Sequence, residues 1–217
     1  MRNDAGLRGV AQVRLLVTDD SAYDELVADA ALARWAVVIA FEEAARCKEF
    51  LRGEPGWKAV GTELAMVLPD IEAATDAPLP DGLEFRTVPD SVSLLDAATA
   101  AIASDPAITG SPEDVAGFLS GLPPSASVFA AVDGDGVAHA TAASHVFGEY
   151  AQIFFVSTEP TWRRRGIGSA MTFGALRAAA SRGARTAILH STEIGVSVYA
   201  GLGFEPVGMV TRYAPAD

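Results

Sequence analysis

The stretch from Ile153 to Arg177, IFFVSTEPTWRRRGIGSAMTFGALR, decides the fold that we expect for this chain. Its first residues, Ile153 to Val156, form a continuous apolar run that is typical of a buried strand. Pro160 ends that strand, because proline donates no hydrogen bond to a ladder. Residues 163–168, RRRGIG, then combine three arginines with two glycines. The stretch therefore predicts a strand that leads into a basic, glycine-containing loop.

An amphipathic helix is predicted after the loop, because apolar residues recur there at intervals of three and four. They are Ile167, Met171, Ala175 and Ala178 or Ala179. A strand, a basic glycine loop and a helix N-terminus together predict an anion site, since the first helical turn has free N–H groups at the positive end of the helix dipole. The dinucleotide-binding fingerprint does not fit, because its third glycine would stand at Met171, and the Walker A lysine is missing.

The composition favours a globular protein with a sizeable core. The chain has 217 residues, half of them hydrophobic, enough for one large domain or one and a half. No apolar run reaches the ~20 residues of a membrane span, and the N-terminus lacks the apolar segment of a signal peptide. We therefore expect a cytoplasmic protein with no membrane partner. Cys47 is the only cysteine, which excludes an internal disulfide and a cysteine-based zinc site.

The charge is unevenly distributed along the chain. The formal net charge of −12 argues against a nucleic-acid partner, because such proteins neutralise phosphates with a basic surface. Residues 87–162 contain nine acidic residues and no Lys or Arg, whereas residues 163–192 contain six arginines and no acidic residue. This concentration of positive charge around the glycine loop favours an anionic cofactor.

The N-terminal part is predicted to be a small α/β unit. Its expected elements are a strand in 10–17, a helix over 21–33, a strand over 35–40, a helix over 42–52 and two short strands over 57–60 and 63–68. A linker rich in proline and aspartate, Asp76–Gly82, predicts the domain boundary. We therefore expect an accessory domain over 1–80 and a second domain over 83–217.

The second domain is predicted to alternate strands and helices. Ser111 before Pro112 is an N-cap signal for its second helix. The expected order is a strand over 83–88, helices over 91–103 and 112–121, a hairpin of 127–132 and 137–145, the strand and helix described above, a strand over 186–190, a helix over 195–200 and final strands within 207–213.

Two motifs in this domain resemble those of the GCN5-related N-acetyltransferase (GNAT) family. Arg163, Gly166 and Gly168 match its motif A, Arg/Gln-x-x-Gly-x-Gly/Ala, and 198–204, VYAGLGF, is similar to its motif B. The element order over 83–213 is also that of the family. The resemblance implies an α/β (α+β) fold of the GNAT acyl-CoA N-acyltransferase type, with a mixed central sheet flanked by helices, preceded here by a smaller N-terminal α/β portion.

The resemblance also implies acetyl-CoA as co-substrate, with the loop around its pyrophosphate. In the family the strand before the loop is bulged and splays from its neighbour, so that backbone N–H groups reach the acetyl carbonyl and the pantetheine arm. The cofactor-binding residues expected here are Val156, Ser157, Thr158, Arg163, Arg164, Arg165, Gly166, Ile167, Gly168 and Ser169.

Tyr199 matches the family's tyrosine, which can protonate the leaving thiolate; the alternative is a ring that packs on Phe204. The general base stays open among Glu149, His190 and Glu193, each of which could also be an ordinary surface or strand-end residue. His139 and His145 lie six residues apart in one strand, too far apart to bind one metal ion, and we expect no metal site.

The resemblance implies an acetyl-CoA-dependent N-acetyltransferase that acts on a primary amine by direct attack. The acidic segment 87–162 favours a small, cationic amine as acceptor, and the protein is expected to be a monomer or a homodimer. The alternatives are a protein N-terminal or lysine acetyltransferase and a non-catalytic CoA-binding regulatory module.

The N-terminal portion also resembles the C-terminal half. Residues 56–61, GWKAVG, and 203–208, GFEPVG, share glycine, an aromatic residue, valine and glycine at equal spacing. Either two ordinary units coincide, or 30–72 is a degenerate copy that folds as strand, helix, strand, strand, binds no CoA and packs on the catalytic domain.

Overall fold

A computed structural model describes residues 13–17, 37–41, 45–53, 57–88, 91–104, 108 and 110–215. The chain forms two compact units. Among the described residues, the first unit holds 67–189 and 195–205, and the second holds those up to 66 with 190–194 and 206–215. This division falls before Val67, because the C-terminal strand β9 pairs with the N-terminal strand β2. The domain boundary at the linker 76–82 stays a prediction. The helix predicted over 21–33 lies outside the described residues.

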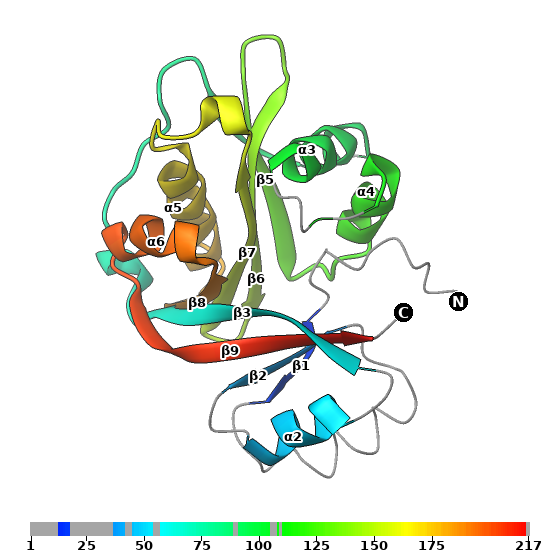
Figure 1. Ribbon diagram of the computed structural model, residues 1–217. Helices are drawn as coiled ribbons and strands as arrows, with labels where there is room; N and C mark the ends of the chain where they lie inside the picture. Colours follow the sequence, from blue (N-terminus) through cyan, green and yellow to red (C-terminus); the bar gives the residue numbers. More distant parts are fainter. Residues whose placement is uncertain are drawn as a thin grey trace. The chain divides into compact units, whose positions relative to one another are not determined.

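The first unit is a mixed sheet flanked by helices, as predicted (Figure 1). Its strand order is β4-β5-β6-β7-β8, with antiparallel pairing from β4 to β7 and parallel pairing between β7 and β8. The strands are β4 (Glu84–Thr87), β5 (Ala126–Val132), β6 (Ala138–Phe147), β7 (Tyr150–Thr158) and β8 (Thr186–Ser191), whose last two residues belong to the second unit. The helices are η3 (Ile71–Ala73), α3 (Ser91–Ser104), α4 (Pro112–Ser120), η4 (Pro160–Trp162), α5 (Ile167–Ala180) and α6 (Val196–Gly201).

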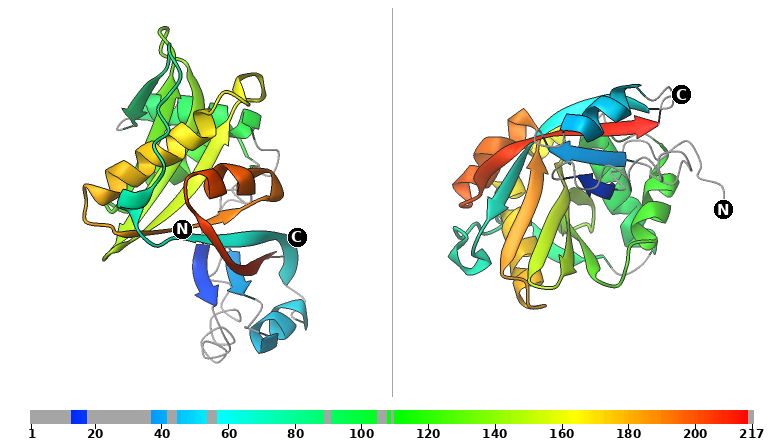
Figure 2. Two further views of the ribbon diagram at one scale, coloured as in Figure 1. Left: turned by 90° about the vertical axis from the view of Figure 1, so that its left-hand side faces the viewer. Right: turned by 90° about the horizontal axis from the view of Figure 1, so that it is seen from below.

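Alternate residues of β5 distinguish the two faces of this sheet. Val128 and Ala130 belong to the core that also contains Leu94 of α3 and Val115 of α4. Phe129, between them, stacks on the ring of Phe85 at 4.9 Å, and that ring lies against Gly174 of α5. Since successive strand residues point to opposite faces, α3 and α4 cover one face and α5 covers the other (Figures 1 and 2).

Local sequence signals account for two of the helices. Ser111 and Asp114 form a capping box, in which each side chain accepts a hydrogen bond from the other's backbone N–H at the start of α4. In α5 the predicted apolar side, from Ile167 to Ala179, is buried. Both helices confirm the sequence predictions.

The second unit contains β1 (Val13–Val17), β2 (Val37–Phe41), α2 (Ala45–Gly53) and most of β3 (Trp57–Leu68) and β9 (Glu205–Pro215), in the strand order β1-β2-β9-β3. The short isolated strands predicted over 57–60 and 63–68 are instead one continuous strand. Gly61 does not take a positive φ and therefore makes no turn. The final strands predicted in 207–213 are likewise one strand, β9. Strand, helix and strand follow each other in 37–68, and the repeat itself stays a prediction.

Candidate functional site

The second half of β7 is bulged. Thr141 of β6 pairs with Ser157, and Ala143 pairs with Phe154, so β7 has one residue more than β6 between these pairs. Phe155, within the bulge, has a φ of 56°, which non-glycine residues seldom adopt. The hydroxyl of Thr141 donates a 2.9 Å hydrogen bond to the carbonyl oxygen of Phe155 and stabilises this conformation.

Beyond its first three residues, β7 separates from β8. The parallel register joins Tyr150–Gln152 to Thr186–Ile188, whereas β7 continues to Thr158. The backbone groups on this edge beyond residue 153 are therefore not paired with β8, and they lie in the segment 156–158 where the donors were predicted. The bulge and the splay are the two features that the resemblance implied for this strand.

The loop between β7 and α5 ends in an uncapped helix N-terminus. Gly166, the N-cap residue, has a φ of 78° and makes no side-chain capping bond. The first intrahelical hydrogen bond runs from Ala170 N to Gly166 O at 3.0 Å. The N–H groups of Ile167, Gly168 and Ser169 thus have no partner within the helix and can bind an anion.

Gly168 marks the point where three elements meet. A Cβ atom placed on Gly168 would lie 3.9 Å from Thr158 Oγ1 at the end of β7 and 3.9 Å from Val198 Cγ1 in α6. Tyr199, the next residue of α6, is 9% exposed, and its ring meets that of Phe204 edge-on at 6.0 Å. The structure therefore brings the glycine loop, the end of β7 and the helix of Tyr199 together.

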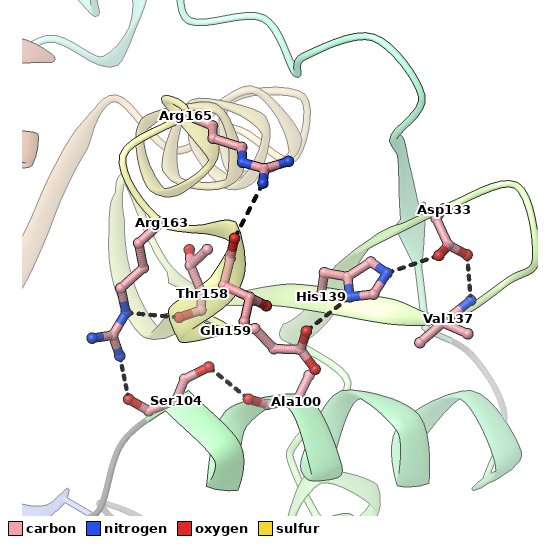
Figure 3. Close-up of polar contacts among 10 residues, drawn as sticks. Ala100, Ser104, Asp133, Val137, His139, Thr158, Glu159, Arg163 and Arg165 are labelled. Carbon is pink, nitrogen blue, oxygen red and sulfur yellow. Dashed lines mark hydrogen bonds and ion pairs between the residues drawn. The ribbon is translucent and has the colours of Figure 1, made fainter.

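The guanidinium of Arg163 is bound to protein carbonyl groups. Its Nε donates to Thr158 O at 3.1 Å, and a terminal nitrogen donates to Ser104 O, at the end of α3, at 2.6 Å (Figure 3). Both acceptors belong to the backbone, so this side chain connects α3 to the end of β7. Its role as a direct cofactor ligand stays a prediction.

The other two arginines differ from each other. Arg165 donates to Thr161 O at 3.2 Å, and its guanidinium carbon lies 4.9 Å from the centre of the Trp162 ring. The side chain of Arg164, whose φ is 63°, has no hydrogen-bond or ion-pair partner within the described part of the chain. Arg164 is therefore the loop cation best able to bind a phosphate.

A buried histidine beside the loop was missed as a functional residue by sequence reasoning. His139, 8% exposed, places Nε2 2.8 Å from Asp133 Oδ2 and Nδ1 2.9 Å from Glu159 Oε2 (Figure 3). Its ring also stacks on Trp162 at 4.1 Å. Asp133 lies six residues before His139 and Glu159 lies twenty residues after it. No local sequence pattern could therefore have indicated the cluster.

Glu149 is not near the loop. It lies in the tight turn between β6 and β7, where its carbonyl oxygen accepts hydrogen bonds from the N–H groups of Arg185 and Thr186. Nine strand residues separate it from the loop end of β7, a span of about 30 Å at 3.3 Å per residue. Glu149 therefore lies at the opposite end of β7 from the loop, and its role as the base stays a prediction.

The remaining base candidates, His190 and Glu193, belong to the second unit. Burial, together with the positive charge of Arg212, lowers the pKa of His190 from 6.5 to about 4. Arg212 also forms an ion pair with Glu63 at 3.4 Å. Glu193 is exposed on η5 (Glu193–Gly195). His190 is thus a neutral imidazole at pH 7.

Sequence comparison identifies the family. Residues 98–204, which include the glycine loop and Tyr199, match the model of the acetyltransferase (GNAT) family. The chain belongs to the GNAT family. The mixed sheet with its bulged, splayed strand is accordingly the GNAT fold, and the protein is a GNAT-family N-acetyltransferase.

Solved structures of GNAT proteins share the fold at low identity. A GCN5-related N-acetyltransferase from Kribbella flavida is 22% identical with a TM-score of 0.63, over 88% of this chain and 72% of that one. One from Sphaerobacter thermophilus is 17% identical with a TM-score of 0.62, over 88% of this chain and 64% of that one. A tandem GNAT protein from the clavulanic acid biosynthesis pathway is 15% identical with a TM-score of 0.58, over 83% and 64%. No curated protein matches the sequence.

Two features are absent from the part of this GNAT protein that the structure describes. None of its described helices is long and apolar enough to cross a membrane. Within the same residues, no group of three or more His, Cys, Asp or Glu could hold a metal ion.

Proposed function

We propose that this GNAT protein transfers the acetyl group of acetyl-CoA to a primary amine of a small, cationic acceptor by direct attack. The observation that carries the proposal is the convergence at Gly168 of the loop, the end of β7 and the helix of Tyr199. With the pyrophosphate of acetyl-CoA on the loop, the pantetheine arm would extend along β7 and bring the thioester to the bulged half of that strand. A phenol on α6 would then lie on the same side as the leaving sulfur.

The loop and the strand would bind different parts of acetyl-CoA. The N–H groups of 167–169 and the guanidinium of Arg164 would hold the pyrophosphate. N–H groups between Val156 and Thr158 that point away from β6 would donate to the acetyl carbonyl, where negative charge develops during attack. One such preorganised donor contributes about 3 kcal/mol to transition-state stabilisation.

The reaction requires two proton transfers. The neutral amine attacks the thioester carbon, the C–S bond breaks, and the thiolate takes up a proton; a thiol has a pKa of ~8.5. We propose that the phenol of Tyr199, which matches the family's tyrosine, donates this proton to the thiolate. The amine gives up its proton to a general base or to solvent water.

The acidic segment supports a cationic acceptor, although part of its charge is used inside the protein. Asp133 and Glu159 bind His139, and Asp114 caps α4. Asp96 on α3 and Glu113 on α4 are exposed. Exposed carboxylates on these two helices would attract an ammonium group.

Release of CoA from acetyl-CoA in the presence of an amine panel tests the proposal. We expect polyamines and aminoglycoside-like amines to be acetylated faster than neutral or anionic amines. Acetylation of peptides alone would instead identify a protein acetyltransferase, and binding of acetyl-CoA without turnover of any amine would identify a CoA-binding module. Absence of acetyl-CoA binding would refute the proposal altogether.

Tyr199→Phe is the matched variant for this assay, because it keeps the ring beside Phe204 and removes the proton donor. We expect turnover to fall by about 100-fold or more, with acetyl-CoA affinity little changed. Turnover close to that of the wild type, with chemistry rate-limiting, would assign Tyr199 to packing.

A further inference from the structure

The imidazole of His139 is held between two carboxylates that come from different segments. Asp133 lies in the turn between β5 and β6, and Glu159 directly follows β7. An ionised carboxylate only accepts hydrogen bonds, so both ring nitrogens must donate, and the ring is an imidazolium. The cluster therefore depends on a proton that a free histidine loses near neutral pH.

Burial is the largest influence on the pKa of His139 and lowers it, but the hydrogen bonds and charges of the two carboxylates together outweigh burial. The net effect raises the pKa of His139 above 6.5. The hydrogen bond from His139 lowers the pKa of Asp133 in turn. The geometry and the raised pKa thus both favour the charged form of the ring over the neutral form.

The cluster contacts the segment that leads into the cofactor loop at both of its ends. Glu159 immediately precedes η4, and its N–H donates to the carbonyl oxygen of His139 at 2.9 Å. Trp162 ends η4, and its ring stacks on the imidazole. Arg165, which packs on the same indole, already belongs to the loop. A change at the imidazole would therefore reach the loop within a few residues.

Few other charges act on this ring. Two helices, α3 and α5, pack on β6, and each carries one charged residue in its described range. Asp96 of α3 is exposed, and Arg177 of α5 forms an ion pair with Glu72 at 2.6 Å. The proton on His139 is thus governed mainly by Asp133 and Glu159, with Arg165 on the indole.

We propose that His139 is a positioning residue of the cofactor loop: its imidazolium, clamped by Asp133 and Glu159, fixes η4 and thereby the N–H groups that hold the pyrophosphate. This inference rests on the proposed binding of acetyl-CoA by the loop. When the ring loses a proton, one nitrogen becomes an acceptor facing a carboxylate oxygen, and one hydrogen bond of the clamp is lost. The loop then loses a restraint, and acetyl-CoA binds more weakly.

Linkage makes this testable in both directions. If the protonated ring favours acetyl-CoA binding, bound acetyl-CoA must raise the pKa of His139 by the corresponding amount. The chain has three histidines, so NMR titration of the imidazole C–H signals can follow each of them. His145→Gln and His190→Gln identify the His139 signal by elimination.

The decisive experiment measures acetyl-CoA affinity by calorimetry, without acceptor amine, between about pH 6 and about pH 9. We expect wild-type affinity to fall across this range by about two- to thirtyfold, the range for mutations along a coupled network. His139→Gln, which keeps a donor and loses the charge, should bind weakly at every pH with a flat profile. His145→Gln, on the same strand, should keep the wild-type profile.

The outcomes separate this inference from the proposed function. Two outcomes would overturn the positioning role alone. In the first, the wild type and His139→Gln bind acetyl-CoA with the same pH profile. In the second, acetyl-CoA leaves the pKa of His139 unchanged. No binding at any pH would overturn the proposed function and this inference together. Should His139→Gln fail to fold, Glu159→Gln and the wild-type NMR titration give the same discrimination.

Discussion

The guanidinium of Arg163 donates a 2.6 Å hydrogen bond to the carbonyl oxygen of Ser104, which lies 59 residues earlier in the chain. Ser104 is the last residue of α3, where carbonyl groups have no partner within the helix. The motif arginine thus satisfies a helix end, and its second bond, to Thr158 O, connects that end to β7. In this protein the first residue of the GNAT motif therefore connects the end of α3 to the end of β7.

Arg163 and Arg164 are therefore expected to differ in their effects on binding. Arg164→Ala should weaken acetyl-CoA binding more at low salt than at high salt, because its exposed charge is screened by ions. Arg163→Ala should instead lower the melting temperature, since it leaves the Ser104 and Thr158 carbonyl groups without their donor. Calorimetry at two ionic strengths and thermal unfolding check both. A salt-dependent loss in Arg163→Ala, without loss of stability, would restore Arg163 as a cofactor ligand.

Gly168→Asp should abolish acetyl-CoA binding, because it adds both bulk and negative charge at the first turn of α5. Gly168→Ala is the matched control for folding: its Cβ would meet Thr158 and Val198 at 3.9 Å, an ordinary contact distance. The alanine variant should fold normally and bind acetyl-CoA more weakly than the wild type. A folded aspartate variant with unchanged affinity would exclude this loop from the cofactor site.

Gly174→Ala should destabilise the first unit without altering the site. A Cβ at Gly174 would clash with the ring of Phe85, and Phe85 is confined by its stack on Phe129. Overpacking of this kind costs about 1–3 kcal/mol, which chemical denaturation can measure. Phe85→Leu should recover part of the loss in the double variant. Equal stability of Gly174→Ala and wild type would show that Phe85 moves freely.

His190 and His139 should affect stability in opposite pH ranges. The pKa of His190 falls from 6.5 to about 4 on folding. Between these values only the unfolded chain binds the proton, so stability falls as pH drops through this window, by about 3 kcal/mol in total. The pKa of His139 is raised, so its contribution is complete below pH 6.5 and is lost as pH rises through the folded value.

Denaturation of His190→Gln and His139→Gln across pH separates these effects. The first variant should flatten the stability profile on the acid side, and the second should flatten it on the alkaline side. Identical profiles for both variants would contradict the placement of the two rings.

Local sequence was sufficient where the physical cause is local. Ser111 and Pro112 predict the start of α4, because an N-cap acts within one turn. The spacing of Ile167 and Met171 predicts the buried side of α5, because helical periodicity belongs to a single segment. Gly166 and Gly168, with the motif around Tyr199, were enough to indicate the family, and their role as a cofactor loop stays a prediction.

Tertiary structure decided the roles that depend on partners distant in sequence. The bond between the guanidinium of Arg163 and Ser104 O joins residues that no local sequence pattern connects. Glu149 is close to β7 in sequence but lies at the far end of that strand from the loop, because an extended chain separates its ends. His139 acquires its charge from two carboxylates that only the fold brings to one ring. Hydrogen bonds and ion pairs act over a few ångströms in space, and sequence separation does not determine that distance.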